Sequence, residues 1–445
     1  MLKFLLVICA LYFSTVYASQ SSSATSGVAS EIRFNNFDKS IRLRWDGTYY
    51  LTDEGLSVQL NNQLLVKTNK RLLLNDLISE HDDIVEGKEV FVAHNFNYYL
   101  VKFAKHSNMG AAINTLTQAS DVLLVQPDIL QVGYLQANVG ASGLQQSLFD
   151  SRMSNTPGRA VFAHDSHTHL TTREQKEVRA KRQARIYRNY LTKVGVPKLW
   201  DTNVGEGIRI AIIDDGIELR HPALVHVNKT LIYDVDSHVT TLDAMAMGAD
   251  HGTQIAGVIF SAHDSGVSNN IRGLAPGASL IALRNPSTRT SKTLLAFQLA
   301  MLANADIINC SWNTHRLLQP IADAVNELAK HGREGKGTAI IFAAGNDGME
   351  IENQRVEASL DAALVVAASN PRGKRLLSSN YGESVDLLVY GRGVHSTAGK
   401  EEYKVFAGTS LAAAITTGLA AITLATNHDL TLKQLQAQLV LITSH

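Results

Sequence analysis

Cysteine is scarce in this sequence. Only two cysteines occur in 445 residues, and Cys9 lies in an apolar N-terminal segment that we expect to be removed. Cys310 is then left without an intramolecular partner, which excludes a small secreted domain held together by disulfides. Because Cys310 falls in the apolar run ADIINCSW, we interpret it as a small buried hydrophobic side chain.

An excess of charge of one sign is also missing. Lys plus Arg and Asp plus Glu both number 41, so the formal net charge is zero at pH 7. No basic surplus favours nucleic acid or an anionic membrane as a partner. With 45% hydrophobic and 18% charged residues, the chain is typical of a globular protein that forms one large core and a smaller domain.

Apolar segments long enough to span a membrane are lacking. Residues 1–18, MLKFLLVICALYFSTVYA, carry one basic residue, then an apolar run, then small residues, which predicts a signal peptide cleaved after Ala18. Ser14 and Thr15 interrupt the run, and the later LAAAITTGLAAITLA is too short for a span. We therefore expect an exported protein, secreted or periplasmic, with a disordered Ser-rich stub over residues 19–30.

The chain after the stub divides into three parts. Residues 31–136 alternate strand and helix patterns, which predicts a small α+β unit with helices on one face of an antiparallel sheet. Residues 137–190 are polar and basic, and we interpret them as an exposed linker with a possible processing site. Residues 191–445 repeat the pattern of buried strand and helix, which predicts an α/β domain with a parallel sheet and helices on both faces.

Three histidines in the linker could suggest a metal site. No acid or cysteine completes a ligand pattern around His164, His167 and His169, so we interpret them as solvated and predict no metal ligand. The basic run RAKR at 179–182 is expected to be exposed and extended, as a protease would require. The alternative is that this run forms one charged face of a helix.

Four short polar motifs stand at predicted strand ends or helix starts. IRIAIIDDG ends in Asp214, HGTQIAG starts with His251, GTSLAAA contains Ser410, and FAAGNDG contains Asn346. Each motif alone fits a turn or a helix cap. Together they are more specific, because reactive groups in parallel sheets gather at the carboxyl ends of strands.

The four side chains fit one chemistry. A serine hydroxyl is a weak nucleophile, so an imidazole must accept its proton and a carboxylate must orient that imidazole. Free N–H groups at a helix N-terminus, together with an asparagine amide, can stabilise an oxyanion. The order Asp, His, Ser along the chain is one of the known orders of such a triad.

On these motifs, residues 191–445 resemble the subtilisin-like serine proteases. The resemblance implies that Asp214 is the triad acid, His251 the base, Ser410 the nucleophile and Asn346 the oxyanion donor. It also implies a secreted endopeptidase that acts on proteins or peptides through an acyl-enzyme. The DDG pair and the block GREGKGTAIIFAAGNDG resemble the kexin and furin-like branch. The residues that the resemblance assigns to substrate binding are Asp215, Ser311, Trp312 and Gly345.

Several positions depart from the family pattern. Ala414 stands where the family usually has proline, and Ala223 stands in place of a frequent calcium ligand. We therefore expect no certain cofactor, with calcium only as a possibility. The segment THRLLQP after CSWN has no acids, so a strict dibasic specificity is not carried over.

The resemblance also assigns a role to the first half of the chain. Residues 31–136 resemble the propeptide that inhibits such enzymes within the same molecule, so we expect a zymogen. Maturation is predicted either near Tyr134 and Leu135 or at Arg182.

Other functions stay open at this point. A catalytically silent binding protein with the same fold would show the same alternation of buried strands and helices. A nucleotide-binding protein would need a glycine-rich phosphate loop after its first strand, and the chain has none. An α/β-hydrolase esterase would need Gly-x-Ser-x-Gly, whereas Ser410 lies in GTSLA.

Overall fold

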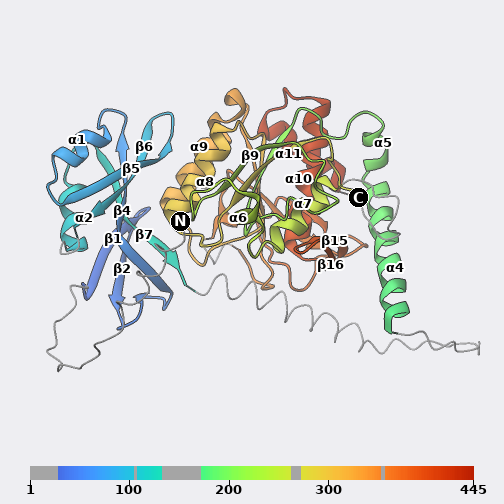
Figure 1. The fold of residues 1–445 in the computed structure, drawn as a ribbon, viewed down its shortest axis with the longest axis horizontal. Coiled ribbons are helices and arrows are strands. Elements are labelled where there is room, and N and C mark those ends of the chain that lie inside the picture. Colours follow the sequence, from blue (N-terminus) through green and yellow to red (C-terminus); the bar gives the residue numbers. More distant parts are fainter. Residues whose placement is uncertain (1–28, 105–107, 133–171, 262–271, 352–355, 445) are drawn as a thin grey trace, which may run out of the picture.

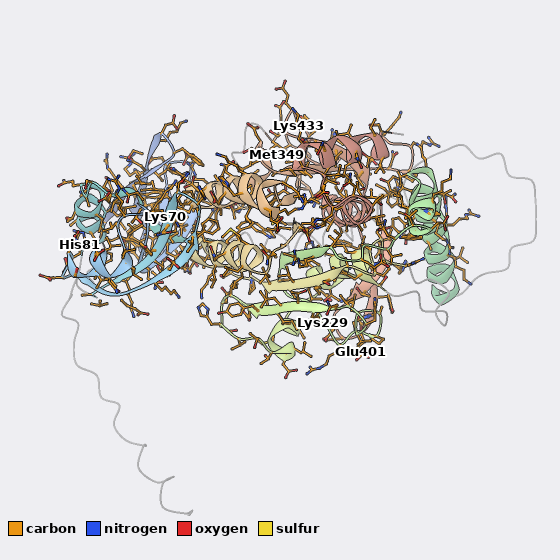
Figure 2. The ribbon with its side chains drawn as sticks, turned by 90° about the horizontal axis from the view of Figure 1, so that it is seen from above. Lys70, His81, Lys229, Met349, Glu401 and Lys433 are labelled. Carbon is orange, nitrogen blue, oxygen red and sulfur yellow. The ribbon has the colours of Figure 1, made fainter. Side chains whose placement is uncertain are left out.

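A computed structural model describes residues 29–104, 108–132, 172–261, 272–351 and 356–444. It contains two seven-stranded sheets, one in each half of the chain (Figure 1). The predicted signal peptide, the cut site near Tyr134 and the three linker histidines lie outside the described residues. Figure 2 shows the same arrangement from above, with Lys70 and His81 in the N-terminal unit and Lys433 across the molecule.

The N-terminal unit is an antiparallel sheet with two helices on one face. In strand β4, Leu64 and Val66 pack in one core with Leu77 of α1, while Leu65 joins a second core on the opposite face. The sheet order is β1-β2-β3-β4-β6-β5, and β7 pairs with the free edge of β4. The elements are β1 (Glu31–Asn36), β2 (Lys39–Trp45), β3 (Tyr50–Thr52), β4 (Ser57–Asn69), α1 (Leu74–Ser79), β5 (Ile84–Val92), β6 (Phe96–Phe103), α2 (Met109–Thr117) and β7 (Val122–Gln131).

The second sheet is parallel and buried on both faces. Ile210 and Ile212 of β8 pack in one core, and Ala211 and Ile213 pack in the other. This alternation explains why the strand is apolar without interruption. The sheet order is β14-β13-β12-β11-β8-β10-β9. Its strands are β8 (Arg209–Asp214), β9 (Lys229–Asp234), β10 (Ser279–Arg284), β11 (Ile307–Cys310), β12 (Ala339–Ala343), β13 (Leu364–Ser369) and β14 (Leu387–Tyr390).

Helices cover both faces of the parallel sheet, as predicted. Helices α7 and α10 contribute to one core, and helices α8 and α9 contribute to the other. The N-terminal sheet packs against α8 and α9 from outside, through residues such as Leu65 and Tyr98 (Figure 1). The remaining elements are α5 (Val196–Trp200), α6 (Leu242–Ala246), α7 (His251–Phe260), α8 (Thr290–Leu302), α9 (Gln319–His331), η1 (Arg333–Gly335), η2 (Glu357–Ser359), β15 (Val394–Ala398), β16 (Glu402–Phe406), α10 (Thr409–Thr426) and α11 (Leu432–Thr443).

The predicted linker differs from expectation at its C-terminal end. Helix α4 (Thr172–Lys193) contains the RAKR run, which is therefore helical rather than extended. Ala184, Tyr187 and Leu191 of α4 are buried against the parallel-sheet domain, so this domain begins before residue 190. The spacing of these three residues is the three- and four-residue spacing of an amphipathic helix, which favours helix over linker.

Helix α10 crosses the core of the parallel-sheet domain. Among the described residues it is the one helix whose length and composition would suffice to cross a membrane. The prediction that this segment is too short was therefore wrong on length. However, 89% of its 18-residue window is buried within the protein, which is typical of a core helix.

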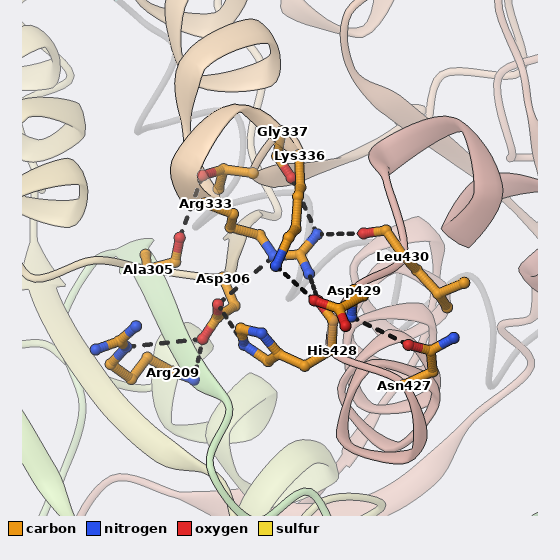
Figure 3. Close-up of polar contacts among 11 residues, drawn as sticks. Arg209, Ala305, Asp306, Arg333, Lys336, Gly337, Asn427, His428, Asp429 and Leu430 are labelled. Carbon is orange, nitrogen blue, oxygen red and sulfur yellow. Dashed lines mark hydrogen bonds and ion pairs between the residues drawn. The ribbon is translucent and has the colours of Figure 1, made fainter.

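A polar network joins the elements at the amino ends of the sheet strands (Figure 3). Asp306 is buried and accepts the backbone N–H of Arg209 at 2.9 Å. The Arg333 side chain is 1% exposed, and its Nε lies 3.6 Å from Asp306 Oδ1. Its guanidinium also donates to the carbonyl oxygens of Leu430 at 3.0 Å and His428 at 2.7 Å. The network thus ties the loop between α10 and α11 to the sheet.

Candidate active site

The carboxyl end of β8 and the start of α7 bring an acid and an imidazole together. Asp214 is the last residue of β8, and His251 is the first residue of α7. The Asp214 Oδ1 lies 2.8 Å from His251 Nδ1, and the Asp214 side chain is only 4% exposed. Because a carboxylate can only accept, Nδ1 carries the proton and Nε2 of a neutral ring is left as the acceptor.

Asp215 holds the same histidine through its backbone. Its Oδ2 accepts the N–H of His251 at 3.1 Å, and its Oδ1 accepts the N–H of Gly252 at 2.8 Å. The carboxylate thus satisfies two N–H groups in the first turn of α7. Since both oxygens are engaged in this way, the structure favours a positioning role for Asp215 over the predicted substrate-binding role.

Asp214 contributes to the shifted pKa of both Asp215 and His251. Burial and then the charge of Asp214 raise the pKa of Asp215 to about 7. Burial lowers the pKa of His251, but the charge and hydrogen bond of Asp214, with a contribution from Asp215, outweigh it and raise that pKa. A base whose pKa is set by adjacent groups is typical of a catalytic site.

Ser410 lies in the first turn of α10, directly after a sharp backbone turn. Gly408 precedes the helix with φ of 92°, and a Cβ there would lie 2.8 Å from Asn346 Oδ1. Glycine is therefore required on both conformational and steric grounds. The Ser410 hydroxyl donates to the carbonyl oxygen of Ser311 at 3.3 Å, and no hydrogen bond joins Ser410 to His251 among the described residues. The backbone N–H groups of this first turn have no intrahelical acceptor.

An aromatic contact links the histidine to the strand that leads to the serine. The ring of Phe406, at the end of β16, packs edge-to-face on the His251 imidazole with centroids 5.7 Å apart. Phe406 is buried and stands four residues before Ser410. The contact therefore joins the His251 ring to the segment that leads into the helix of Ser410.

Asn346 is oriented by the start of α10. Its Oδ1 accepts the backbone N–H of Thr409 at 3.0 Å and the Thr409 hydroxyl at 3.2 Å. This assignment makes the other amide atom, Nδ2, the donor of the side chain. Asn346 and the N-terminus of α10 therefore belong to one rigid unit, as a preformed oxyanion site requires.

The loop that carries Asn346 is held in place by hydrogen bonds to Asn380 and Thr409. Gly345 has φ of 100°, and its N–H donates to the Thr409 hydroxyl at 3.3 Å. Asn380 donates its N–H to the carbonyl of Gly345 at 2.9 Å. Its Oδ1 accepts the N–H groups of Asp347 and Met349, each at 3.0 Å. No local pattern around Asn380 marks this role.

The predicted substrate-binding segment follows β11. The carbonyl of Ser311 faces the Ser410 hydroxyl, and the Ser311 hydroxyl donates to Asn309 at 3.0 Å. The indole N–H of Trp312 donates to the carbonyl of Ile213 at 2.8 Å, directly before Asp214. Trp312 is 7% exposed, so its side chain fixes the end of β8 while its backbone borders the site.

The structure thus brings the predicted residues to one edge of the sheet. Asp214 contacts His251, Asn346 contacts the first turn of Ser410's helix, and Ser311 contacts Ser410 directly. Two further residues that no sequence motif marks, Phe406 and Asn380, contact this site from positions distant in sequence. The described residues contain no group of three or more His, Cys, Asp or Glu side chains that could hold a metal ion.

A family model described as the subtilase family matches residues 205–444. The chain is 30% identical over 244 residues to a calcium-dependent protease of Nostoc sp., covering 51% of this chain and 34% of that protein. It is 29% identical over 234 residues to thermitase of Thermoactinomyces vulgaris, covering 52% of this chain and 79% of thermitase. The match thus spans about a third of the Nostoc protein's length. A cold adapted subtilisin-like serine proteinase of known structure aligns with a TM-score of 0.44 at 23% identity, covering 53% of this chain and 82% of the other.

Proposed function

Because the chain belongs to the subtilase family, we propose that it is a serine endopeptidase with Asp214, His251 and Ser410 as its triad. The observation that carries the proposal is the 2.8 Å contact between Asp214 Oδ1 and His251 Nδ1 at the edge where Ser410 begins α10. This contact fixes the tautomer that leaves Nε2 as a base. The kexin and furin-like branch remains a prediction from sequence.

The proposed reaction proceeds through an acyl-enzyme. Ser410 Oγ attacks the carbonyl carbon of the scissile peptide while His251 Nε2 takes the hydroxyl proton. The N–H of Ser410 and Nδ2 of Asn346 donate to the oxyanion. The C–N bond then breaks as His251 returns the proton to the leaving amine. Water, activated by the same imidazole, hydrolyses the ester and restores Ser410.

We further propose that the N-terminal unit is an intramolecular inhibitor, which makes the full chain a zymogen. Asp323 of α9 supports this, because its Oδ2 accepts Lys67 Nζ at 2.8 Å and the Tyr98 hydroxyl at 2.6 Å. Asp128 of β7 accepts the N–H and the hydroxyl of Ser291 in the first turn of α8, each at 2.9 Å. These contacts join β4, β6 and the end of β7 to the domain that holds the proposed triad.

Maturation at Arg182 is compatible with the packing of α4. Lys181 and Arg182 are exposed, and Ala184 is the first buried residue among those of this helix whose side chains the structure describes. A cut after Arg182 would therefore leave the packed half of α4 on the catalytic domain. However, the helix would have to unwind locally before a protease could hold it extended. We retain Tyr134 and Arg182 as the two proposed boundaries, in a protein that we propose is exported.

Calcium enters only as a proposal from relatives named as calcium-dependent proteases. Among the described residues, no group of three or more His, Cys, Asp or Glu side chains is arranged to hold a metal ion. We therefore assign calcium no step. A catalytically silent subtilisin-fold protein is the alternative function, and it has no feature of the described site in its favour.

The decisive experiment labels the purified protein with a fluorophosphonate and measures hydrolysis of casein. We expect labelling and hydrolysis in the wild type and neither in Ser410→Ala, while His251→Ala loses hydrolysis to the same extent because the triad acts as a unit. N-terminal sequencing of the wild type and Ser410→Ala then identifies cuts that the enzyme makes itself. A folded wild type that this sequencing shows to have lost its N-terminal unit, and that neither labels nor hydrolyses, would establish the silent alternative.

A further inference from the structure

A small cavity lies between the N-terminal unit and the catalytic domain, and its lining includes the apolar side chains of Leu318 and Ile321 as well as polar groups. Its free volume is about 10 Å³, room for about one water molecule. Four threonines line it, together with Trp312 and the buried Glu357; the threonines are Thr288, Thr290, Thr293 and Thr314. Gln131, the last residue of β7, closes it from the side of the N-terminal unit.

The end of β7 runs between two loops of the catalytic domain. On one side, Arg289 donates to the carbonyl of Asp128 at 2.8 Å, and Thr290 donates to the carbonyl of Ile129 at 3.1 Å. On the other side, Gln131 contacts Arg316. An extended segment held on both sides in this way is positioned as a peptide substrate would be.

The Gln131 side chain makes a two-point contact with the backbone N–H and C=O of one loop residue, Arg316. Its Nε2 donates to the carbonyl of Arg316 at 2.7 Å, and its Oε1 accepts the N–H of Arg316 at 2.9 Å. A primary amide is the side chain that offers a donor and an acceptor in this geometry. Gln131 is 6% exposed, so both hydrogen bonds are shielded from water.

A buried acid holds the loop that carries Arg316. Glu357 is 1% exposed, and its carboxylate accepts the N–H of Thr314 at 2.8 Å and the Thr314 hydroxyl at 2.6 Å. The Thr314 hydroxyl also lies 2.9 Å from the carbonyl oxygen of Arg316. Glu357 and Thr314 therefore fix the direction of the two backbone groups that meet Gln131.

The cavity is adjacent to the proposed catalytic centre along the segment that follows β11. Trp312 forms one wall, and the residue before it, Ser311, accepts the hydroxyl of Ser410. Gln131 lies three residues before Tyr134 (134 − 131), one of the two predicted cut sites. Three extended residues span roughly 10 Å. A peptide whose first residue takes the position of Gln131 can therefore extend its fourth residue that far toward the Ser410 side of the cavity.

We propose that the Gln131 side chain fills a substrate subsite, of which this cavity is the space left unfilled, and that the subsite selects a glutamine side chain at the fourth position before the cut. The inference rests on the proposed endopeptidase function and names part of its specificity. Glutamate in this position would face the Arg316 carbonyl without a proton to donate. An apolar side chain of the same length would leave the N–H of Arg316 unpaired, and the carbonyl of Arg316 would keep only the Thr314 hydroxyl.

The first test uses peptides based on residues 129–137, ILQVGYLQA, with Gln131 kept or replaced by Met or Glu. The enzyme is used as it matures from the full chain, and kcat/KM is measured for each peptide. We expect cleavage after the tyrosine and a preference for Gln over Met and over Glu of about tenfold or more, since the unfavoured peptides leave buried polar groups unpaired.

A matched pair of variants tests the loop. Thr314→Val keeps the side-chain shape but removes the hydroxyl, whereas Thr314→Ser keeps the hydroxyl. We expect the ratio of kcat/KM for the Gln and Met peptides to fall toward one in Thr314→Val and to persist in Thr314→Ser. Arg316→Ala keeps the backbone groups and should keep the ratio. Fluorophosphonate labelling reports the fraction of each variant that is folded and active.

The outcomes separate this inference from the function on which it rests. Cleavage after tyrosine with equal rates for Gln and Met would overturn the amide subsite and leave the endopeptidase standing. Cleavage only at other bonds would overturn the assignment to the fourth position. No labelling and no cleavage by the wild type would overturn the endopeptidase and the subsite together.

Discussion

The ring of Phe406 packs edge-to-face on the imidazole of His251, with the two centroids 5.7 Å apart. This contact joins the first residue of α7 to the strand that runs into the helix of Ser410. The imidazole is thus held in two ways. Asp214 holds its Nδ1 by a hydrogen bond, and Phe406 packs against its ring.

We predict that Phe406→Leu lowers kcat by about tenfold to a hundredfold, because a small displacement of a catalytic base is costly. KM should change little, since Phe406 is placed behind His251 rather than against substrate. Phe260→Leu is the matched control, because Phe260 is buried at the other end of α7. It should lower thermal stability without a specific loss of kcat. Equal kcat values for the two variants would contradict the positioning role of Phe406.

The acid limb of the pH profile depends on Asp215. His251 must be neutral to accept a proton, so activity falls as the pH drops through its pKa. Because the nearby carboxylates raise this pKa, removing one negative charge lowers it. Asp215→Asn should therefore shift the acid limb of kcat/KM to lower pH, by roughly one unit. The measurement is the pH dependence of kcat/KM between pH 5 and 9.

Asp250→Asn is the control for that experiment. Asp250 precedes His251 in the chain, but its carboxylate pairs with Lys404 Nζ at 2.7 Å and accepts the N–H of Gly399 at 2.9 Å. We expect its acid limb to move less than that of Asp215→Asn. An unshifted profile in Asp215→Asn, with altered preference among peptides, would instead favour the substrate-binding role predicted from sequence.

Two substitutions of Asn346 separate the role of its Nδ2 donor from that of its Oδ1 acceptor, which anchors the side chain to Thr409. Asn346→Ala removes both, whereas Asn346→Asp keeps an oxygen that can accept the N–H of Thr409. Both remove the Nδ2 donor, so each should lower kcat by about 10²–10³ with little change in KM. Single-turnover acylation rates measure the effect directly. Wild-type acylation in Asn346→Asp would exclude Nδ2 as an oxyanion donor.

The network at the opposite end of the sheet should govern stability rather than chemistry. Asp306→Asn leaves the buried guanidinium of Arg333 without its carboxylate, and we expect a loss of about 3 kcal/mol or more in the free energy of unfolding. Asp429→Asn removes the exposed pair with Lys336 and should unfold close to the wild type. Urea denaturation of Ser410→Ala carrying each change avoids self-digestion. Similar midpoints for the two would contradict this role of Asp306.

Much of the fold was predictable because its signals are local. The apolar run that became β8 could only be a strand buried on both faces, and its neighbours repeat that pattern, so the parallel sheet with helices on both faces was confirmed. The Asp214, His251 and Ser410 motifs were found because each stands at a strand end or helix start. The helix α4 had a local signal too, in the spacing of Ala184, Tyr187 and Leu191, but the polar composition of the segment hid it.

The sequence by itself determined which chemical groups the protein carries and the edge of the sheet at which they gather, since strand direction places the strand ends together. The tertiary structure alone decided which side chains support them. Phe406 on His251, Asn380 beneath Gly345, Glu357 behind Thr314 and Gln131 against Arg316 join residues distant in the chain. Their partners depend on how buried donors and acceptors are satisfied when the layers pack, and no local pattern of residues records that outcome.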